Sequence, residues 1–216
     1  MTGTTRSGDR PAGRTAARSA TRARLMAAGE RLIGLHGIDG ISLEDIARHA
    51  GQANKYAVQY HFGSRDGLIQ AILDARISAV EARRQALMAT MDPASAVSIL
   101  AVFVGPLAEQ VDADGDCAFA RFLLQFATQF QPWPNIVHPL RAAGQGSVSL
   151  MLFKALCGAI PTVAPAVLGR RLMLLMHLPL RALLPADAAM AEAYAPTPLA
   201  DVIAMMAAAL AVPEPA

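Results

Sequence analysis

The sequence predicts an all-α fold, and three features of its composition favour that class. Hydrophobic residues make up 54% of the 216-residue chain and charged residues only 17%, so there are enough apolar side chains to bury a sizeable core. Much of the apolar fraction is alanine, leucine and methionine, which are strong helix formers. Aromatic residues contribute only 5%, and alternation of β-branched residues is hard to find, which disfavours strands.

The hydrophobic stretches do not predict a membrane protein. The richest of them, residues 148–168, is interrupted by Lys154, Pro161 and Pro165, whereas a spanning helix needs roughly 18–20 uninterrupted apolar residues. The N-terminus has no apolar segment of the kind found in secretory signals. Cys117 and Cys157 form no CxxC pair. We therefore expect a reduced, cytoplasmic protein without a membrane partner.

Charge is distributed unevenly along the chain. Residues 1–84 contain 13 Lys and Arg against 8 Asp and Glu, whereas residues 85–216 contain 6 against 9. A basic N-terminal part suits a polyanionic partner, and the acidic remainder does not require one.

Three regions follow from composition and periodicity. Residues 1–20 are rich in Gly, Thr, Ser, Arg and Ala and have almost no apolar anchors, which predicts a disordered basic tail. Residues 21–75 contain short helical patterns separated by glycine, and we expect them to form one domain. Residues 76–216 predict a second, helical domain, with patterns near 94–110, 116–130, 136–159, 164–184 and 197–211.

The first region of helices has the layout of a helix-turn-helix. A helix from about Thr21 ends at His36-Gly37, and a second begins after Ser42, which has an acidic residue, Asp45, three positions later as in a capping box. The second helix carries Leu43, Ile46, Ala47 and Ala50 on one face and ends at Gly51. A short third helix is expected over residues 55–62, and Ser64 is expected to cap a fourth that runs to about Met91. In this layout the third helix enters the major groove of DNA.

The same residues resemble a known family. The run from Leu43 to Gly51 (LEDIARHAG), followed by residues 58–68 (VQYHFGSRDGL), is similar to the N-terminal domain of TetR/AcrR-family regulators. The turn differs from most members, because Gly51-Gln52-Ala53-Asn54-Lys55 is one residue longer than the usual Ala-Gly-Val-Ser pattern and is similar to a subgroup with Gln and Asn here. The resemblance implies a transcriptional regulator with a helical ligand-binding and dimerisation domain.

Chemistry assigns roles to the exposed residues of this region. Gln59 can pair with adenine and Lys55 can donate to guanine, while tyrosines, serines and arginines can contact phosphates and sugars. The expected DNA-binding residues are Arg22, Ser42, Asn54, Lys55, Tyr56, Gln59, Tyr60, His61, Ser64 and Arg65. The expected partner is a palindromic duplex, bound by a homodimer that presents two recognition helices about one DNA turn apart.

The second region predicts a dimer interface and a ligand cavity. Two patterns, 164–184 and 197–211, are so apolar that pairing with a second copy is the expected way to cover them. The expected interface residues are Leu172, Leu175, Met176, Leu183, Leu199, Val202, Ile203, Met206 and Leu210, although packing within one chain would also explain them. Aromatic residues at helical spacing could line a cavity for a small apolar effector, although such a stripe more often belongs to the core. The residues are Phe119, Phe122, Phe126, Phe130 and Trp133.

Other functions are less well supported by the sequence. No nucleophile motif, phosphate-binding glycine loop or histidine spacing typical of a metal site is present, so we expect no enzyme activity, metal or cofactor. We expect a repressor that a small molecule releases from DNA. The alternative is a helical protein that binds a lipid or small molecule and has a helix-turn-helix that no longer reads DNA, which the longer turn would favour.

Overall fold

The described part of the chain consists of helices and contains no strand, as the composition predicted. The computed structural model describes residues 10–112, 114–127, 147–185 and 197–214. The helices are α1 (Arg10–His36), α2 (Leu43–His49), α3 (Ala57–Phe62), α4 (Arg65–Leu87), the 3₁₀ turn η1 (Met88–Thr90), α5 (Ala96–Ala108), α6 (Ala118–Ala127), α8 (Val148–Ala159), α9 (Pro165–Leu175), α10 (His177–Ala182) and α12 (Leu199–Leu210). None of the described helices is long and apolar enough to cross a bilayer.

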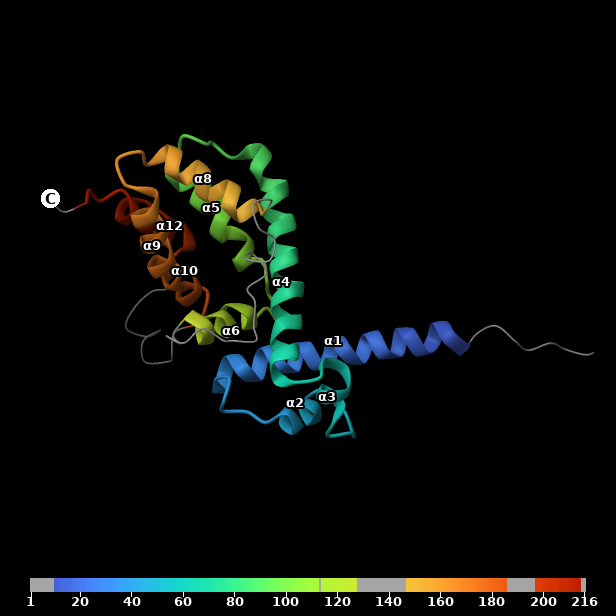
Figure 1. Ribbon diagram of the computed structural model, residues 1–216. Coiled ribbons are helices and arrows are strands. Elements are labelled where there is room, and N and C mark those ends of the chain that lie inside the picture. The colour runs from blue at the N-terminus through green and yellow to red at the C-terminus, as the bar shows by residue number, and fades with distance from the viewer. Residues whose placement is uncertain (1–9, 113, 128–146, 186–196, 215–216) are drawn as a thin grey trace, which may run out of the picture.

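Two groups of helices are joined by α4. In Figure 1, α2 and α3 lie at the lower end against α1 and the start of α4, while α5, α8, α9, α10 and α12 form a bundle at the other end of α4. The predicted boundary between residues 75 and 76 falls inside α4, which continues without a break to Leu87. The two parts of the molecule therefore share a helix.

The start of α1 differs from the prediction. Residues 10–20, which we expected to belong to a disordered tail, form the first turns of α1, and residues 13–20 are exposed. The prediction relied on the absence of apolar anchors, but Ala and Arg favour helix without burial, and a helix already fixed by packing at Leu25 extends at little cost. The end of α1 is as predicted, because Gly37 follows with φ of +79°.

Serine caps begin α2 and α4 as the sequence predicted. Ser42 Oγ accepts a hydrogen bond from the Asp45 amide at 3.0 Å, and Ser64 Oγ accepts one from the Gly67 amide at 3.0 Å. The hydrogen bond from the Ser42 hydroxyl also holds the pKa of the Asp45 carboxyl below its usual value. These caps fix where each helix starts, and so fix the end of the loop before α2 and of the loop between α3 and α4.

Residues 164–184 form two helices rather than the single helix that we expected. The chain turns at Met176, between α9 and α10. Pro179 lacks the amide that would bond to the Leu175 carbonyl, so the ladder of α9 cannot continue through this position. The predicted pattern at 136–159 is described only from residue 147 onward, where α8 begins.

Candidate nucleic-acid interface

The turn between α2 and α3 is held by backbone and side-chain hydrogen bonds. Gly51 has φ of +68°, and the Gln52 amide donates to the Ala47 carbonyl at 2.9 Å, so the chain reverses directly behind α2. Asn54 Oδ1 accepts from the Tyr56 amide at 3.0 Å, and the Asn54 carbonyl accepts from the Ala57 amide at 3.0 Å. This local turn starts α3 at Ala57, two residues later than predicted.

Asn54 and Lys55 thus precede the helix to which we had assigned them. The Asn54 side chain supports the backbone of the turn. Its Oδ1, which we expected to face DNA, accepts the hydrogen bond from the Tyr56 amide instead. Lys55 is exposed, and its Nζ lies 5.3 Å from the centre of the Tyr56 ring. The longer turn therefore moves the start of α3 while leaving Lys55 on the surface.

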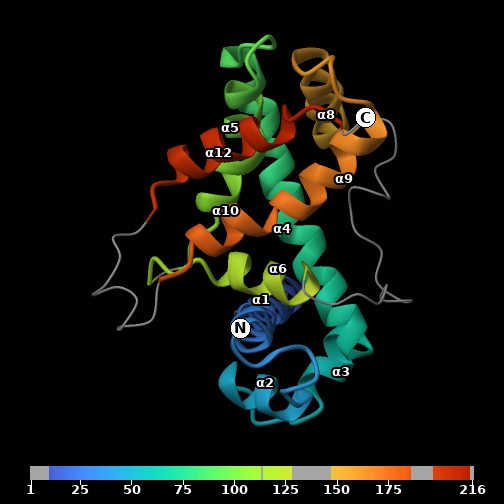
Figure 2. The ribbon, with the colours of Figure 1, turned by 90° about the vertical axis from the view of Figure 1, so that its left-hand side faces the viewer.

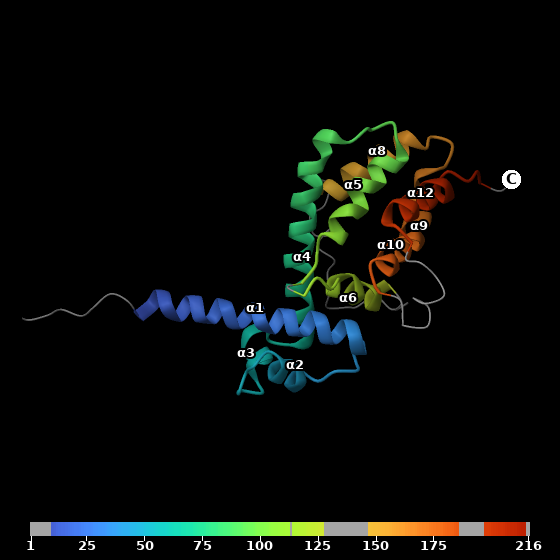
Figure 3. The ribbon, with the colours of Figure 1, turned by 180° about the vertical axis from the view of Figure 1, so that it is seen from behind.

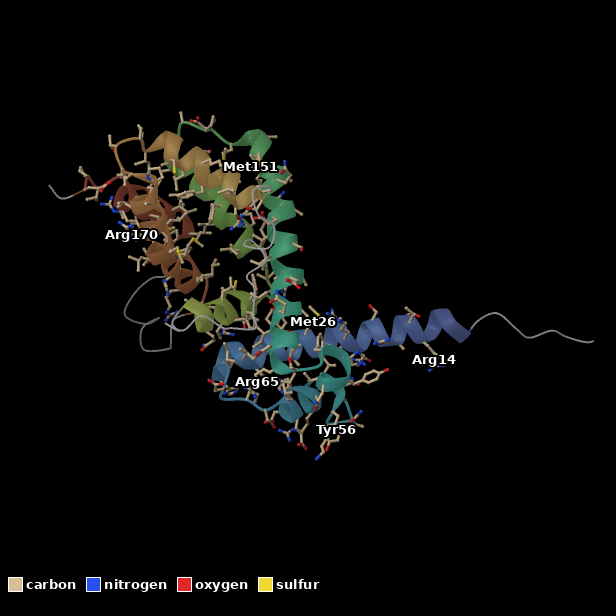
Figure 4. All side chains as sticks on the ribbon, viewed as in Figure 1. Arg14, Met26, Tyr56, Arg65, Met151 and Arg170 are labelled. Carbon is tan, nitrogen blue, oxygen red and sulfur yellow. The ribbon has the colours of Figure 1, made fainter. Side chains whose placement is uncertain are left out.

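One face of α3 is buried and the other is open to solvent. Ala57 and Val58 are buried in the core shared by α1, α2 and α4, and Phe62 packs against the edge of that core. On the other face Gln59 is exposed, and Tyr56 and Tyr60 are 61% and 69% exposed. Figure 4 shows Tyr56 at the lower edge of the molecule, on the far side of α3 from the bundle. The helix thus presents polar and aromatic groups on a fixed support.

Arg65, which was predicted to contact phosphate, holds the loop between α1 and α2. Its guanidinium donates to the Ile38 carbonyl and, at 2.7 Å, to the Ile41 carbonyl. Asp39 lies 3.9 Å away. These contacts hold the loop before α2 against the start of α4. Arg65 therefore helps to fix the position of α2 relative to α4.

Two arginines of α1 lie against the residues at the end of α3. The Arg22 guanidinium carbon is 4.8 Å from the centre of the Phe62 ring, and that of Arg18 is 5.6 Å from the centre of the Tyr60 ring. Burial lowers the pKa of His61, and the positive charges of Arg18 and Arg22 lower it further. Both effects favour the neutral form of His61, which lies near two positively charged side chains.

The family comparison agrees with this geometry. Residues 25–72, which run from the buried part of α1 to the first turns of α4, match the family described as bacterial regulatory proteins, tetR family. Residues 25–72 form a TetR-family DNA-binding domain. The matched segment contains α2 and α3 of the helix-turn-helix, together with the part of α1 that supports them. A comparison with curated proteins finds no match.

A shallow hollow lies on the exposed side of the TetR-family domain. It has a volume of about 190 Å³ and is lined by Leu43, Glu44, Lys55, Tyr56 and Gln59. We assigned no role to Glu44 from the sequence, because it lies in the first turn of α2 and the turn into α3 follows the other end of that helix. Only the fold brings it beside Lys55 and Gln59. A carboxylate here can accept a hydrogen bond from a cytosine amino group.

The predicted effector cavity is not formed by the described aromatic residues. Phe119 and Phe122 are fully buried, their ring centres are 6.2 Å apart, and both belong to the core that packs α6 against α1. We interpreted the regular spacing of these aromatic residues as the lining of a cavity. At these two positions it reflects the packing of α6 against α1. The side chains of Phe126, Phe130 and Trp133 lie outside the described residues.

The residues predicted to form the dimer interface are mostly inside one chain. Five of them lie in the core formed by α5, α8, α9 and α12: Leu172, Val202, Ile203, Met206 and Leu210. Leu175, Met176, Leu183 and Leu199 are partly buried against the two cores. Intramolecular packing, the alternative to a dimer seam, therefore accounts for the apolar stripe of α12. In the part of the chain that the structure describes, no group of three or more potential metal ligands is present.

Proposed function

We propose that this protein is a DNA-binding transcriptional regulator in which α3 reads base edges in the major groove through Gln59. Lys55, in the turn before α3, reads base edges beside it, and Tyr56, Tyr60 and His61 contact the sugar-phosphate backbone. The observation that supports this most directly is the division of α3 into a buried face at Val58 and an exposed face at Gln59 and Tyr60. A helix fixed in this way keeps its outer side chains in register with a duplex. Ser42, Asn54, Ser64 and Arg65 support the surface by holding its loops and helix ends. Arg22 lies against Phe62 at the edge of this surface.

Replacing Gln59 by Ala tests this reading. If Gln59 pairs with adenine, we expect affinity for a duplex selected from random sequences to fall by about 5- to 150-fold, which corresponds to about 1–3 kcal/mol for a bidentate base contact. Affinity for unrelated duplexes should change little, because phosphate contacts supply most of that binding. The measurement is a titration of both duplexes at one fixed salt concentration.

A matched glutamine provides the control. Gln85 is also exposed, but it lies on α4 at the end that is far from α3, so Gln85→Ala should bind both duplexes as the unmodified protein does. Equal loss of affinity for selected and unrelated duplexes in Gln59→Ala would contradict base reading by this residue.

We propose that the regulator is a homodimer that binds a palindrome, with a contact surface different from the one first predicted. Four apolar side chains are exposed on neighbouring helices of the bundle: Met173 and Leu174 on α9, Leu178 on α10 and Met205 on α12. Met173 and Leu174 are 76% and 73% exposed. Figure 2 shows α9, α10 and α12 side by side on one face of the bundle, away from α4. An exposed apolar surface of this kind supports association with a second copy.

A charge at this surface should separate the protomers. We expect Met173→Asp to raise the dissociation constant of the dimer at least about tenfold, because a desolvated charge in an apolar contact costs more than about 1.4 kcal/mol. Met151→Asp is the control, since Met151 is exposed on α8 instead. Sedimentation equilibrium measures the association. A Met173→Asp variant that remains fully dimeric at the lowest measurable concentration would exclude this surface.

We further propose that the protein represses transcription. A repressor released by a small apolar effector is the expectation that the family resemblance supports. Because Phe119 and Phe122 are core residues, the effector part rests on the resemblance and not on a described cavity.

A further inference from the structure

The first turns of α1 project beyond the helix-turn-helix. Residues 13–20 are exposed, and the first fully buried side chain of the helix is Leu25. Figures 1 and 3 show this end of α1 extending past α3, away from both cores. A core therefore does not explain why the chain is basic here.

The arginines of this segment lie along one side of the helix. Arg14, Arg18 and Arg22 follow one another at intervals of four residues, so each is displaced by only roughly 40° around the helix from the one before. Arg18 precedes Leu25 by seven residues, and Leu25 precedes Leu32 by seven. The stripe of arginines thus continues the buried stripe of α1, and it faces the side on which α2 and α3 lie.

Contacts with α3 confirm this orientation. Arg18 lies against the ring of Tyr60, which is largely exposed, and Arg22 lies against Phe62. Figure 4 shows Arg14 directed to the same side of α1 as the labelled Tyr56. The arginine stripe is consequently continuous with the exposed surface of the recognition helix.

No acidic residue in this part of α1 balances the positive charge of the arginine stripe. No acidic residue occurs between Arg10 and Gly29, although acidic residues near the N-terminus of a helix would be stabilising and basic ones are not. The charges of the stripe therefore do not stabilise this end of the helix, although arginine itself is a good helix former. A duplex that lies against α3 and continues past it presents phosphates to this side of α1.

We propose that Arg14, Arg18 and Arg22 form a second DNA-binding surface on α1, which binds backbone phosphates of the DNA flanking the half-site read by α3. The proposal rests on the proposed function of α3, and it gives residues 10–20 a role as part of α1, where we had predicted a disordered tail. Each protomer would then cover more of the duplex than its helix-turn-helix alone.

The test compares two charge-matched double variants of the full chain. Arg14→Gln/Arg18→Gln removes two members of the stripe, and Arg24→Gln/Arg83→Gln removes two exposed arginines from outside it. Each phosphate that the protein no longer neutralises should make the slope of log K against log salt concentration shallower by about 0.9. We therefore expect the slope of the first variant to be shallower by about 1.8 per protomer and the second variant to retain the slope of the unmodified protein.

Hydroxyl-radical footprinting of the selected duplex completes the test. The stripe variant should lose protection outside the half-sites and keep the protection inside them, and circular dichroism of the free protein and its complex checks that α1 remains helical. An unchanged slope and footprint would overturn the proposal even if specific binding persists. A protein that selects no sequence at all would instead contradict the reading of DNA by α3, so the two failures are distinguishable.

Discussion

Replacing Arg84 by Met is expected to lower the free energy of unfolding by about 3–5 kcal/mol, because it removes the charged partner of the mostly buried Glu81 carboxylate. Arg84 is only 2% exposed and lies where α4, α5 and α8 meet. Its Nη1 donates to Glu81 at 3.0 Å and to Ser149 Oγ at 2.6 Å, and its Nε donates to the Phe103 carbonyl at 2.9 Å. One guanidinium therefore ties three helices together.

The neighbouring residue provides a control of the same chemical type. Arg83 pairs with Glu109 at 2.7 Å, but both side chains are close to half exposed, so solvent screens the pair. We expect Arg83→Met to cost about 0–1 kcal/mol. Unfolding in urea, followed by circular dichroism, measures both variants. Similar losses in Arg83→Met and Arg84→Met would contradict a special role for the buried cluster.

A further variant separates the loss of a partner from the loss of the whole cluster. When Arg84→Met is combined with Glu81→Leu and Ser149→Ala, no charged or hydroxyl side chain remains unsatisfied at this point. We expect this triple variant to be more stable than Arg84→Met alone, since apolar replacement of a complete buried pair is often neutral.

The cluster also gives a defined dependence on pH. Burial alone would raise the pKa of Glu81, but the hydrogen bonds from Ser149 and Arg84 outweigh burial and hold the pKa below its usual value of 4.5. A carboxyl whose pKa is lower in the folded protein contributes stability above the unfolded pKa, and the contribution is lost as pH falls through the folded pKa. The unmodified protein should therefore lose more stability below pH 4.5 than the triple variant does.

Particular residues show how far the sequence could predict this structure. The caps at Ser42 and Ser64 and the glycines at the ends of α1 and α2 were predictable, because each depends on chemistry within a few residues. Arg83 and Arg84 were not distinguishable, since consecutive residues of one type differ only in which neighbouring helix they face. Residues distant in the sequence determine that Arg84 is buried and Arg83 is exposed.

The same distinction explains the corrected predictions. The apolar period of α12 indicated correctly that one face would be covered, but it could not tell whether a second chain or α5 would cover it. Arg14 and Arg18 were interpreted as part of a disordered tail because burial was taken as the only source of order. For the recognition surface, the family motif located α3, whereas the hydrogen bond from the Tyr56 amide to Asn54 decided where the helix starts.

Replacing Phe122 by Ala is expected to cost about 3–5 kcal/mol of unfolding free energy, because the ring fills the contact between α6 and α1. Phe122 is fully buried, and its ring stacks on that of Phe119. The two helices approach closely here, since a Cβ atom added to Gly34 would lie 3.2 Å from the Phe122 amide nitrogen. Backbones held so near each other cannot readily close the cavity that the smaller side chain leaves.

Phe153→Ala is the matched control for this substitution. Phe153 is partly exposed on α8 and packs at the edge of the other core, so its removal leaves a space that water can reach and should cost less. Phe122 lies on α6 but belongs to the core that it shares with α1 to α4. Its loss should therefore also lower the temperature at which α1 to α4 unfold. A Phe122→Ala variant as stable as Phe153→Ala would mean that the DNA-binding domain does not depend on α6 for its core.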